Sequence, residues 1–379
     1  MRIVHICLAS HYTEGMNYQD NILPDINSQD GHEVLIISDT QKYINGKLIN
    51  TNEEEKDLKQ NLKLIRINFD KILSKFISEK IRKSKKLYNI LKKFKPNVIL
   101  FHGMCAYELL TVSKYKKENP HIKLYADSHE DFTNSATTFF SKNILHRLFY
   151  KKIALKCLKD IEKVLYISEE TRIFLQDFYE IPNEKLEFYP LGGFIVKKEE
   201  KKIIREKIRK ELEIPQGDLV LIHSGKLDKL KKTFELLEAF AKIDNKNIYL
   251  IIIGSIPDEN TVIYDLIKKD ERVKYLGWKS GDELLEYICA SDIYMQPGSQ
   301  SSTSLTAVCC GLPILLYPSI SYQKMFDTNT FWVKDNNEIE EALVEIIKNP
   351  NILENMSKRS YEIAKNILDY KKLSARLYI

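Results

Sequence analysis

The chain has 379 residues, of which 44% are hydrophobic and 29% charged, as in an average globular protein, so a disordered or low-complexity chain is excluded. Its 58 basic residues are nearly matched by 53 acidic ones, and the formal charge of +5 excludes the strongly basic face of a nucleic-acid-binding protein. No stretch approaches the roughly 18 uncharged apolar residues that cross a bilayer, and residues 1–10 lack the cleavage site of a signal peptide.

Apolar runs of strand length alternate with helical patterns along nearly the whole chain, which predicts parallel α/β architecture. In the first half we expect strands at 3–9, 33–38, 62–67, 98–102, 123–127, 164–168 and 186–189. In the second half we expect strands at 219–224, 248–253, 273–276, 293–296, 314–316 and 331–333, with helices at 233–243, 260–269, 282–290 and 337–348. The sequence also predicts a solvated linker with a helix over 196–211 and one long or kinked helix over 352–379.

This pattern predicts two doubly wound, Rossmann-like α/β domains that are joined near residue 195 and face a central cleft. Ligands of such sheets bind at the carboxyl ends of the strands, near the point where the strand order reverses. We therefore expect the site in the cleft between the two domains.

Two basic amphipathic segments lie in the first half, at residues 71–95 and 142–159. Apolar residues recur in both at helical spacing, so the segments are expected to form surface helices that pack on a sheet. A compatible second interpretation is that their basic faces attract anionic phospholipid or a lipid-linked phosphate.

The six cysteines have no regular spacing and form no CxxC pair. This usage favours free thiols in a reducing cytoplasm over a disulfide framework, and no zinc site is expected.

A basic loop follows the strand expected at 219–224. It contains Gly225, Lys226, Lys231 and Lys232 and leads into an amphipathic helix that starts near Thr233. A helix N-terminus with several lysines can bind a diphosphate through the helix dipole, backbone donors and fixed positive charge. A solvated turn without a ligand is the alternative.

A second loop follows the strand expected at 293–296 and precedes a helix that ends at Gly311. The polar residues of this loop are Ser299, Gln300, Ser301, Ser302, Thr303 and Ser304. Their hydroxyl groups and backbone N–H groups could bind phosphate or sugar, although Ser and Thr also cap helices where no ligand binds.

The order of these segments resembles the retaining GT-B glycosyltransferases that use nucleotide-sugar donors, the family-4-like group 1 enzymes. In that family an opening Gly-Arg-Leu and a following lysine hold the donor diphosphate, and Gly225-Lys226-Leu227 and Lys232 fall on those positions. Residues 306–313 are similar to the family's Glu-Ala-Met-Ala-Cys-Gly-x-Pro segment, and Gly277 is similar to the glycine before the donor base.

The first half continues the resemblance. Gly15 lies where the family has a glycine loop facing the donor phosphates, and His102 matches a strand-end histidine. His129 occupies the place of the histidine beside the transferred sugar, followed by Glu130 and Asp131.

The resemblance implies an acceptor-binding domain over 1–194, a donor-binding domain over 195–358 and a C-terminal helix, 359–379, that crosses back to the first domain. It implies a hexosyltransferase that acts with retention and without a metal or other cofactor. His129 and Lys232 would be catalytic, and His102, Glu130 and Asp131 would contact the acceptor. The implied donor site contains Gly15, Lys226, Lys231, Lys232, Gly277, Ser299, Gln300, Ser301, Ser302, Thr303, Ser304 and Thr306.

One departure concerns two glutamates that family members usually carry in the donor site, because Gly298 and Thr306 occupy their positions. Neither residue can act as a carboxylate, and neither Gln296 nor Gln300 can take a proton. The chain is therefore either a transferase that binds its donor through the 299–304 loop or a non-catalytic subunit that stabilises a partner transferase.

As a transferase, the protein is expected to use a nucleotide-sugar donor that is linked to UDP. The expected acceptor is a glycan or a lipid-linked molecule in the synthesis of cell-surface polysaccharide, capsule or lipopolysaccharide. The protein would work in the cytoplasm, in peripheral contact with the anionic inner face of a membrane, and would bind no nucleic acid. Nucleotide-sugar 2-epimerases and phosphorylases share the fold, but the former lack this motif arrangement and the latter are much longer chains.

Overall fold

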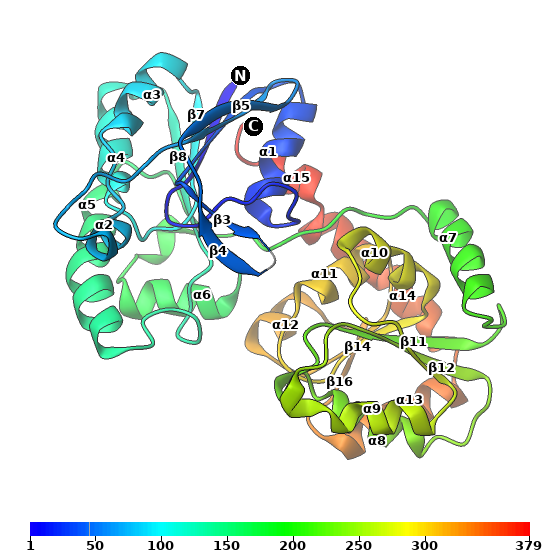
Figure 1. Cartoon of the computed structure of the whole chain (residues 1–379). Coiled ribbons are helices and arrows are strands. Elements are labelled where there is room, and N and C mark those ends of the chain that lie inside the picture. The colour runs from blue at the N-terminus through cyan, green and yellow to red at the C-terminus, as the bar shows by residue number, and fades with distance from the viewer. Residues whose placement is uncertain (45) are drawn as a thin grey trace. The chain divides into compact units, whose positions relative to one another are not determined.

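The computed structural model describes residues 1–44 and 46–379, which divide into two compact units (Figure 1). Unit 1 consists of Met1–Pro190 together with Tyr370–Ile379, and unit 2 of Leu191–Asp369. Each unit is a largely parallel sheet flanked by helices, so the two Rossmann-like α/β folds that the alternating pattern predicts are confirmed.

The main sheet of unit 1 has the strand order β10-β9-β8-β7-β1-β2-β6-β5, and all its pairs are parallel except β5–β6. The strands of unit 1 are β1 (Arg2–Cys7), β2 (Glu33–Ser38), β3 (Gln41–Ile44), β4 (Lys47–Asn50), β5 (Glu54–Lys59), β6 (Leu62–Arg66), β7 (Val98–Phe101), β8 (Lys123–Ser128), β9 (Val164–Tyr166) and β10 (Leu186–Phe188). The antiparallel pair β3–β4 and strand β5 lie in a polar segment for which no strand was expected.

The helices of unit 1 cover both faces of this sheet. They are α1 (Gln19–Gln29), α2 (Lys75–Ile81), α3 (Lys86–Phe94), α4 (Glu108–Glu118), η1 (Ser141–Tyr150), α5 (Lys151–Cys157), α6 (Glu169–Ile173), η2 (Phe174–Phe178), η3 (Asn183–Lys185) and α15 (Tyr370–Ala375). Successive strand residues point to opposite faces, so Val4 packs with the α3–α5 core while Ile3 packs with α1 and α15.

Unit 2 contains a parallel sheet of order β13-β12-β11-β14-β15-β16. Its strands are β11 (Leu219–Ser224), β12 (Ile248–Ile253), β13 (Val273–Tyr275), β14 (Ile293–Gln296), β15 (Ile314–Leu316) and β16 (Thr330–Trp332). Its helices are α7 (Lys198–Glu211), η4 (Lys229–Lys231), α8 (Thr233–Ala241), η5 (Asp258–Asn260), α9 (Val262–Lys269), α10 (Gly281–Ala290), α11 (Ser302–Cys309), α12 (Ile320–Met325), α13 (Asn336–Lys348), α14 (Ile352–Ile363) and η6 (Ala364–Leu368).

Two expected helices are each divided. The segment 71–95 forms α2 and α3, separated at Arg82, which adopts a left-handed conformation (φ 56°). The segment 352–379 is interrupted at Asp369 (ψ 107°), so α14 and η6 belong to unit 2 while α15 belongs to unit 1. Within the described residues, none of the helices has the length and apolar character needed to traverse a bilayer.

Candidate active site

The carboxyl ends of β11 and β12 approach each other through glycines. Gly254 N donates to the Gly277 carbonyl oxygen at 2.8 Å, and a Cβ added to Gly254 would lie 1.7 Å from the Gly225 carbonyl oxygen. Gly225 and Gly254 also have φ values of 142° and 144°, which only glycine adopts without strain. Any side chain at position 254 would therefore separate the two strand-end loops.

The loop before α8 is held against the loop before α11. Ser299 N donates to the Leu230 carbonyl oxygen at 2.7 Å, and a Cβ at Gly298 would lie 2.1 Å from that same oxygen. The Lys231 Nζ donates to the carbonyl oxygens of Ser299 (3.2 Å) and Gln300 (2.8 Å). These contacts bring both predicted donor loops together at one edge of the unit 2 sheet.

The neighbouring lysines point to different partners. Lys232, with a left-handed φ of 54°, directs its Nζ to the Lys334 carbonyl oxygen (2.7 Å) and over the Tyr317 ring (5.2 Å). Lys226 is exposed at the start of the loop. Burial lowers the pKa of Lys231, which fits its role as a clamp between the loops.

The second loop ends as the N-terminus of α11, where Ser301 accepts from Thr303 N at 3.3 Å. The Tyr322 hydroxyl lies 2.8 Å from Ser301 N and 3.2 Å from the Ser304 hydroxyl. Ser302 is exposed, whereas Thr303 and Thr306 are half-buried. The loop therefore caps α11, as one of the two sequence interpretations expects, and ligand binding by its hydroxyl groups stays a prediction.

A buried histidine that the sequence analysis missed, His223 on β11, contacts β14 and the start of α8. His223 lies 2.8 Å from the Met295 carbonyl oxygen through Nδ1 and 2.9 Å from the Thr233 hydroxyl through Nε2. Since a carbonyl only accepts, Nδ1 carries the proton and Nε2 accepts from Thr233. Burial lowers the pKa of His223 to about 4, so the ring stays neutral and fixes the start of α8 to β11 and β14.

In unit 1, a polar cluster lies at the carboxyl ends of β7 and β8. Asp127 accepts from Gly103 N at 2.7 Å and pairs with His102 Nδ1 at 2.6 Å, and its Oδ2 lies 3.8 Å from His129 Nε2. The other nitrogen of His102 lies 3.0 Å from His5 Nδ1, and only 3% of His102 is exposed. With both ring nitrogens engaged, His102 contributes to this cluster through Asp127 rather than by direct contact with a ligand.

The charges of this cluster favour a protonated His129. Burial opposes the positive charge, but the carboxylates of Asp127, Asp20 and Glu130 outweigh it and raise the His129 pKa. Burial likewise opposes the ionised Asp127, while His102 and His129 hold its pKa well below the usual range. The side chain of His129 is 42% exposed, so this histidine is accessible to a substrate.

The two acidic residues after His129 have separate environments. Asp131 accepts from Thr133 N at 2.7 Å and stabilises a turn, whereas Glu130 accepts from the Cys105 thiol, also at 2.7 Å. Neither therefore lies as a free carboxylate beside His129.

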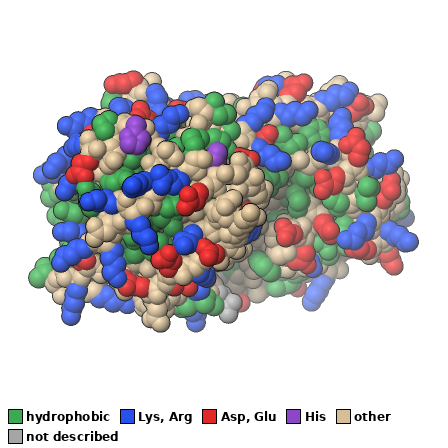
Figure 2. Space-filling view, turned by 90° about the horizontal axis from the view of Figure 1, so that it is seen from above, with side chains coloured by type: hydrophobic (Ala, Val, Ile, Leu, Met, Phe, Trp, Pro, Cys, Tyr) green, Lys and Arg blue, Asp and Glu red, His purple; other side chains and the backbone are tan. Residues whose placement is uncertain are grey.

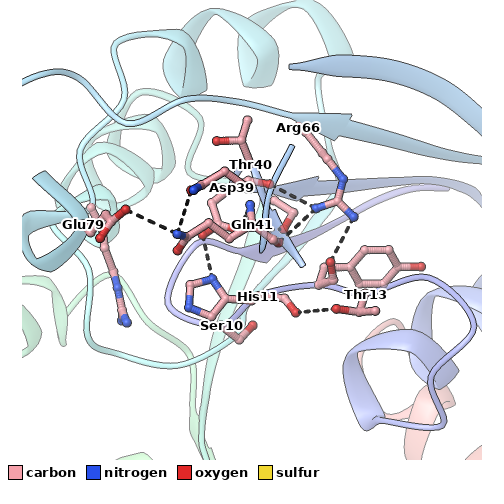
Figure 3. A network of polar contacts seen from close by, with 12 residues as sticks. Ser10, His11, Thr13, Asp39, Thr40, Gln41, Arg66 and Glu79 are labelled. Atoms are coloured by element: carbon pink, nitrogen blue, oxygen red, sulfur yellow. Dashed lines mark hydrogen bonds and ion pairs between the residues drawn. The ribbon is translucent and has the colours of Figure 1, made fainter. Parts of the chain in front are cut away.

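The loop after β1, which contains Gly15, is fixed by a buried arginine (Figure 3). Arg66 donates to the carbonyl oxygens of Asp39 (3.1 Å) and Tyr12 (3.0 Å) and pairs with Glu14 at 2.5 Å. Nearby, His11 Nδ1 lies 2.7 Å from Asp39 Oδ2. Gly15 itself has φ 78° and no atom within 4 Å of an added Cβ, so it lies at an open turn of this fixed loop.

Comparisons with known proteins find similar glycosyltransferases. A model of the family described as "Glycosyl transferases group 1" matches residues 204–363. The chain is 24% identical over 307 residues to the alpha-monoglucosyldiacylglycerol synthase of Acholeplasma laidlawii, covering 75% of this chain and 73% of that protein. It is 22% identical over 213 residues to the N-acetyl-alpha-D-glucosaminyl L-malate synthase of Bacillus anthracis, covering 53% of this chain and 55% of that protein.

A solved structure of HepE from Anabaena in complex with UDP superposes with a TM-score of 0.68 at 13% identity, over 99% of this chain and 98% of that one. The solved structure shows the fold alone, whereas the family model and both relatives indicate the activity. The chain is a glycosyltransferase with the GT-B fold, and its residues 204–363 match the group 1 family.

The transferase brings together the 225–232 and 299–304 loops in unit 2, and His102, Asp127 and His129 in unit 1. Of the other residues predicted for the donor site, Gly15 lies in unit 1. Gly277 lies in unit 2, on the β13 side of the sheet, where its carbonyl oxygen accepts from Gly254 N.

Proposed function

We propose that the transferase binds a nucleoside-diphosphate sugar in unit 2 and transfers the sugar to a saccharide or lipid-linked acceptor bound in unit 1. The proposed nucleotide is UDP. The observation that carries the proposal is the joined pair of loops that start α8 and α11 at one edge of the unit 2 sheet. Two helix N-termini, backbone N–H groups and lysines together suit a diphosphate. The UDP bound to HepE and the glucosylated lipid in the name of the Acholeplasma relative support this choice.

The residues suggest how the leaving nucleotide is stabilised. The diphosphate gains negative charge as the glycosidic bond breaks, and preorganised positive charge in the site lowers that barrier. Lys226 would supply this charge, and so would Lys232, whose exposed hydrogen bond to the Lys334 carbonyl oxygen would be exchanged for the diphosphate. Lys231 donates to the carbonyl oxygens of both Ser299 and Gln300 and would hold the loops in place. No metal is required for this stabilisation, and we propose a metal-independent reaction with retention.

His129 would orient the transferred sugar or the acceptor. It is the exposed member of the unit 1 cluster, and Asp127 fixes its charge and position. His129→Ala should therefore keep nucleotide binding and lower turnover, and unchanged turnover would show that its role is structural. The anomeric configuration of the product, measured by NMR, tests retention.

The first experiment is thermal unfolding of the full chain with UDP, GDP, ADP, CMP and their common sugars, in EDTA and in magnesium. A ligand at 100 times its dissociation constant adds about 2.7 kcal/mol of stability, which raises the midpoint by several degrees. We expect one nucleotide to raise it equally in both buffers. Lys232→Ala should weaken that binding by at least about 1.5 kcal/mol, and Lys348→Ala, an exposed lysine at the end of α13, is the matched control.

The alternative is a non-catalytic subunit, because Gly298 and Thr306 leave both positions of the usual glutamate pair without a carboxylate. If none of the nucleotides shifts the unfolding midpoint, the donor proposal is contradicted and that alternative is favoured.

We further propose that unit 1 contacts an anionic membrane. Exposed apolar side chains accompany the lysines of the two basic segments, and they are Leu73, Phe76, Phe139, Phe140, Ile144 and Leu148. Figure 2 shows Lys and Arg side chains with hydrophobic ones between them along the left edge of the picture, on unit 1. Apolar insertion together with electrostatic attraction is the usual basis of peripheral binding.

Sedimentation with vesicles tests this surface. The chain should bind vesicles that contain phosphatidylglycerol and not pure phosphatidylcholine, and Phe139→Ser, at an 81% exposed position, should weaken binding. Trp278→Ser, at a 74% exposed position of unit 2, is the control. Equal binding to both kinds of vesicle, or an equal effect of both variants, would contradict the proposed contact.

A further inference from the structure

Three side chains of metal-ligating types meet in unit 1. Cys105 follows β7, Glu130 follows β8 and His146 lies on η1, and one ligand atom from each lies within 4.8 Å of the other two. The Cys105 Sγ is 2.7 Å from Glu130 Oε1 and 3.9 Å from His146 Nδ1. Ligands of one tetrahedral zinc ion stand roughly 3.5 Å apart, so the Cys105–His146 distance is close to that of a zinc site. The thiol and the Glu130 carboxylate, now joined by a hydrogen bond, would have to separate by about 1 Å to bind one ion.

The surroundings of the cluster exclude solvent. Cys105 is 3% exposed and His146 7%, and the rings of Tyr150, Phe174 and Phe178 lie around His146. The Tyr179 hydroxyl closes a further side, 3.2 Å from Cys105 Sγ and 2.9 Å from His146 Nδ1. A buried group of this kind is stable only when each polar atom has a partner.

One polar atom of the cluster lacks such a partner. Glu130 Oε2 is shielded from solvent and has no hydrogen-bond partner among the described residues. Leaving a carboxylate oxygen buried without a donor or a cation is costly. This unpartnered oxygen, together with the adjacent thiol and imidazole, is therefore a separate observation that indicates a bound cation.

Of the three groups, His146 is already in the form that binds a metal, whereas Cys105 and Glu130 would lose protons to it. Burial lowers the pKa of His146 to about 4, so its ring is neutral and can ligate. Burial also raises the pKa of Cys105 and of Glu130, so without a metal the thiol keeps its proton and donates it to Glu130. The nearby Arg82, which donates to the Cys105 carbonyl oxygen at 2.7 Å, opposes both shifts and favours the ionised ligands.

From this arrangement we propose that Cys105, Glu130 and His146 bind one zinc ion. The ion replaces the thiol proton, so a thiolate and a carboxylate balance its charge while the imidazole supplies the third ligand. The Tyr179 hydroxyl, which contacts both Cys105 and His146, borders the fourth position that a tetrahedral ion needs. The ion connects the loops after β7 and β8 with η1 and thereby holds the segment that contains His129. Transfer at the donor diphosphate needs no part of it, so the proposal is independent of the proposed donor chemistry.

The test uses the full chain with zinc and with cobalt. Elemental analysis of chain purified in zinc-containing buffer should give about one zinc per chain. Co²⁺ titration should produce the near-ultraviolet band of a thiolate-to-cobalt charge transfer. Because binding displaces the thiol proton, affinity should rise with pH.

Cys105→Ser should abolish the cobalt band. It should also weaken zinc binding, measured against a competing chelator, by more than about 100-fold, because loss of a residue that only hydrogen-bonds to a metal ligand already costs up to that much. Cys157→Ser is the matched control, because Cys157 is a buried thiol of the same unit outside the cluster. Glu130→Gln, which keeps a hydrogen-bonding group, is the second variant should Cys105→Ser not fold. A chain without stoichiometric zinc, or equal affinity in the wild type and in the folded ligand variant, would overturn the proposal.

Discussion

The backbone of Gly298 contacts that of Leu230 so closely that a Cβ at position 298 would lie 2.1 Å from the Leu230 carbonyl oxygen. The hydrogen bond from Ser299 N to the same oxygen, at 2.7 Å, fixes this approach. The family resemblance led us to expect a donor-site glutamate at position 298. No side chain fits there while the two loops are joined, so this loop contact and a carboxylate at position 298 exclude each other.

Gly298→Ala should destabilise unit 2, since the methyl group must push the Leu230–Lys231 backbone away. Overpacking of this kind costs about 1–3 kcal/mol. For a unit of this size, the thermal midpoint should fall by roughly 2–10 °C, measured by circular dichroism. Gly217→Ala is the control, because an added Cβ there has no atom within 4 Å. Equal midpoints for the two variants would mean that the loops are not joined in solution.

Lys231 and Lys226 should separate loop stability from nucleotide binding. Lys231→Met removes two hydrogen bonds from a charged donor to the Ser299 and Gln300 carbonyl oxygens, and bonds of that kind are worth about 1.5–3 kcal/mol each. Lys226→Met changes an exposed side chain and should leave the free energy of unfolding within about 0.5 kcal/mol of the wild type. Urea unfolding without nucleotide measures both, and a stable Lys231→Met variant would show that this lysine does not clamp the loops.

The strands of both sheets could be predicted because parallel strands buried on two faces give continuous apolar runs, as in β11 and β12. Strand β5 could not, because its half-exposed residues are mostly charged. A kink in 352–379 was expected, but its position at Asp369 was not, since the apolar pattern does not say where the chain passes from unit 2 to unit 1.

For the candidate site, the loops with glycine, lysine and serine were recognisable from local sequence, whereas their buried partners were not. His223 acts through Thr233 and Met295, and Cys105 meets Glu130 and His146 only after the chain has folded. No local spacing reveals such contacts. The Lys231–Lys232 pair shows the same limit, because two adjacent lysines of one loop have different backbone partners.

Asp127→Asn should destabilise unit 1 and change its response to acid. The Asp127 carboxylate accepts from Gly103 N and pairs with His102 Nδ1, and hydrogen bonds of a charged group contribute about 1.5–3 kcal/mol each. The Asp127 pKa is depressed, so its stabilising effect is complete above the ordinary carboxyl pKa of 3.8 and is lost as the pH falls below it. The difference between wild type and variant should thus shrink below about pH 4, as measured by urea unfolding.

Asp57→Asn, an 81% exposed side chain on β5, is the control for that comparison and should change little at any pH. A difference between wild type and Asp127→Asn that stays constant from pH 7 into the acid range would exclude Asp127 as the titrating group.

Arg66→Met should loosen the loop after β1. The Arg66 side chain is fully buried and pairs with Glu14 (2.5 Å) and Glu54 (3.0 Å), so its loss should cost about 3–5 kcal/mol in urea unfolding. Burial opposes the ionised Glu14, but Lys56 and Arg66 outweigh it and lower the Glu14 pKa to about 2. That stabilising effect is complete above pH 4.5 and is lost between pH 4.5 and about 2, so the variant should lose less stability than the wild type over this range.

Lys63→Met, which breaks an exposed pair with Glu55, is the control and should cost at most about 1 kcal/mol. An equally small loss for Arg66→Met would show that this arginine does not hold the loop.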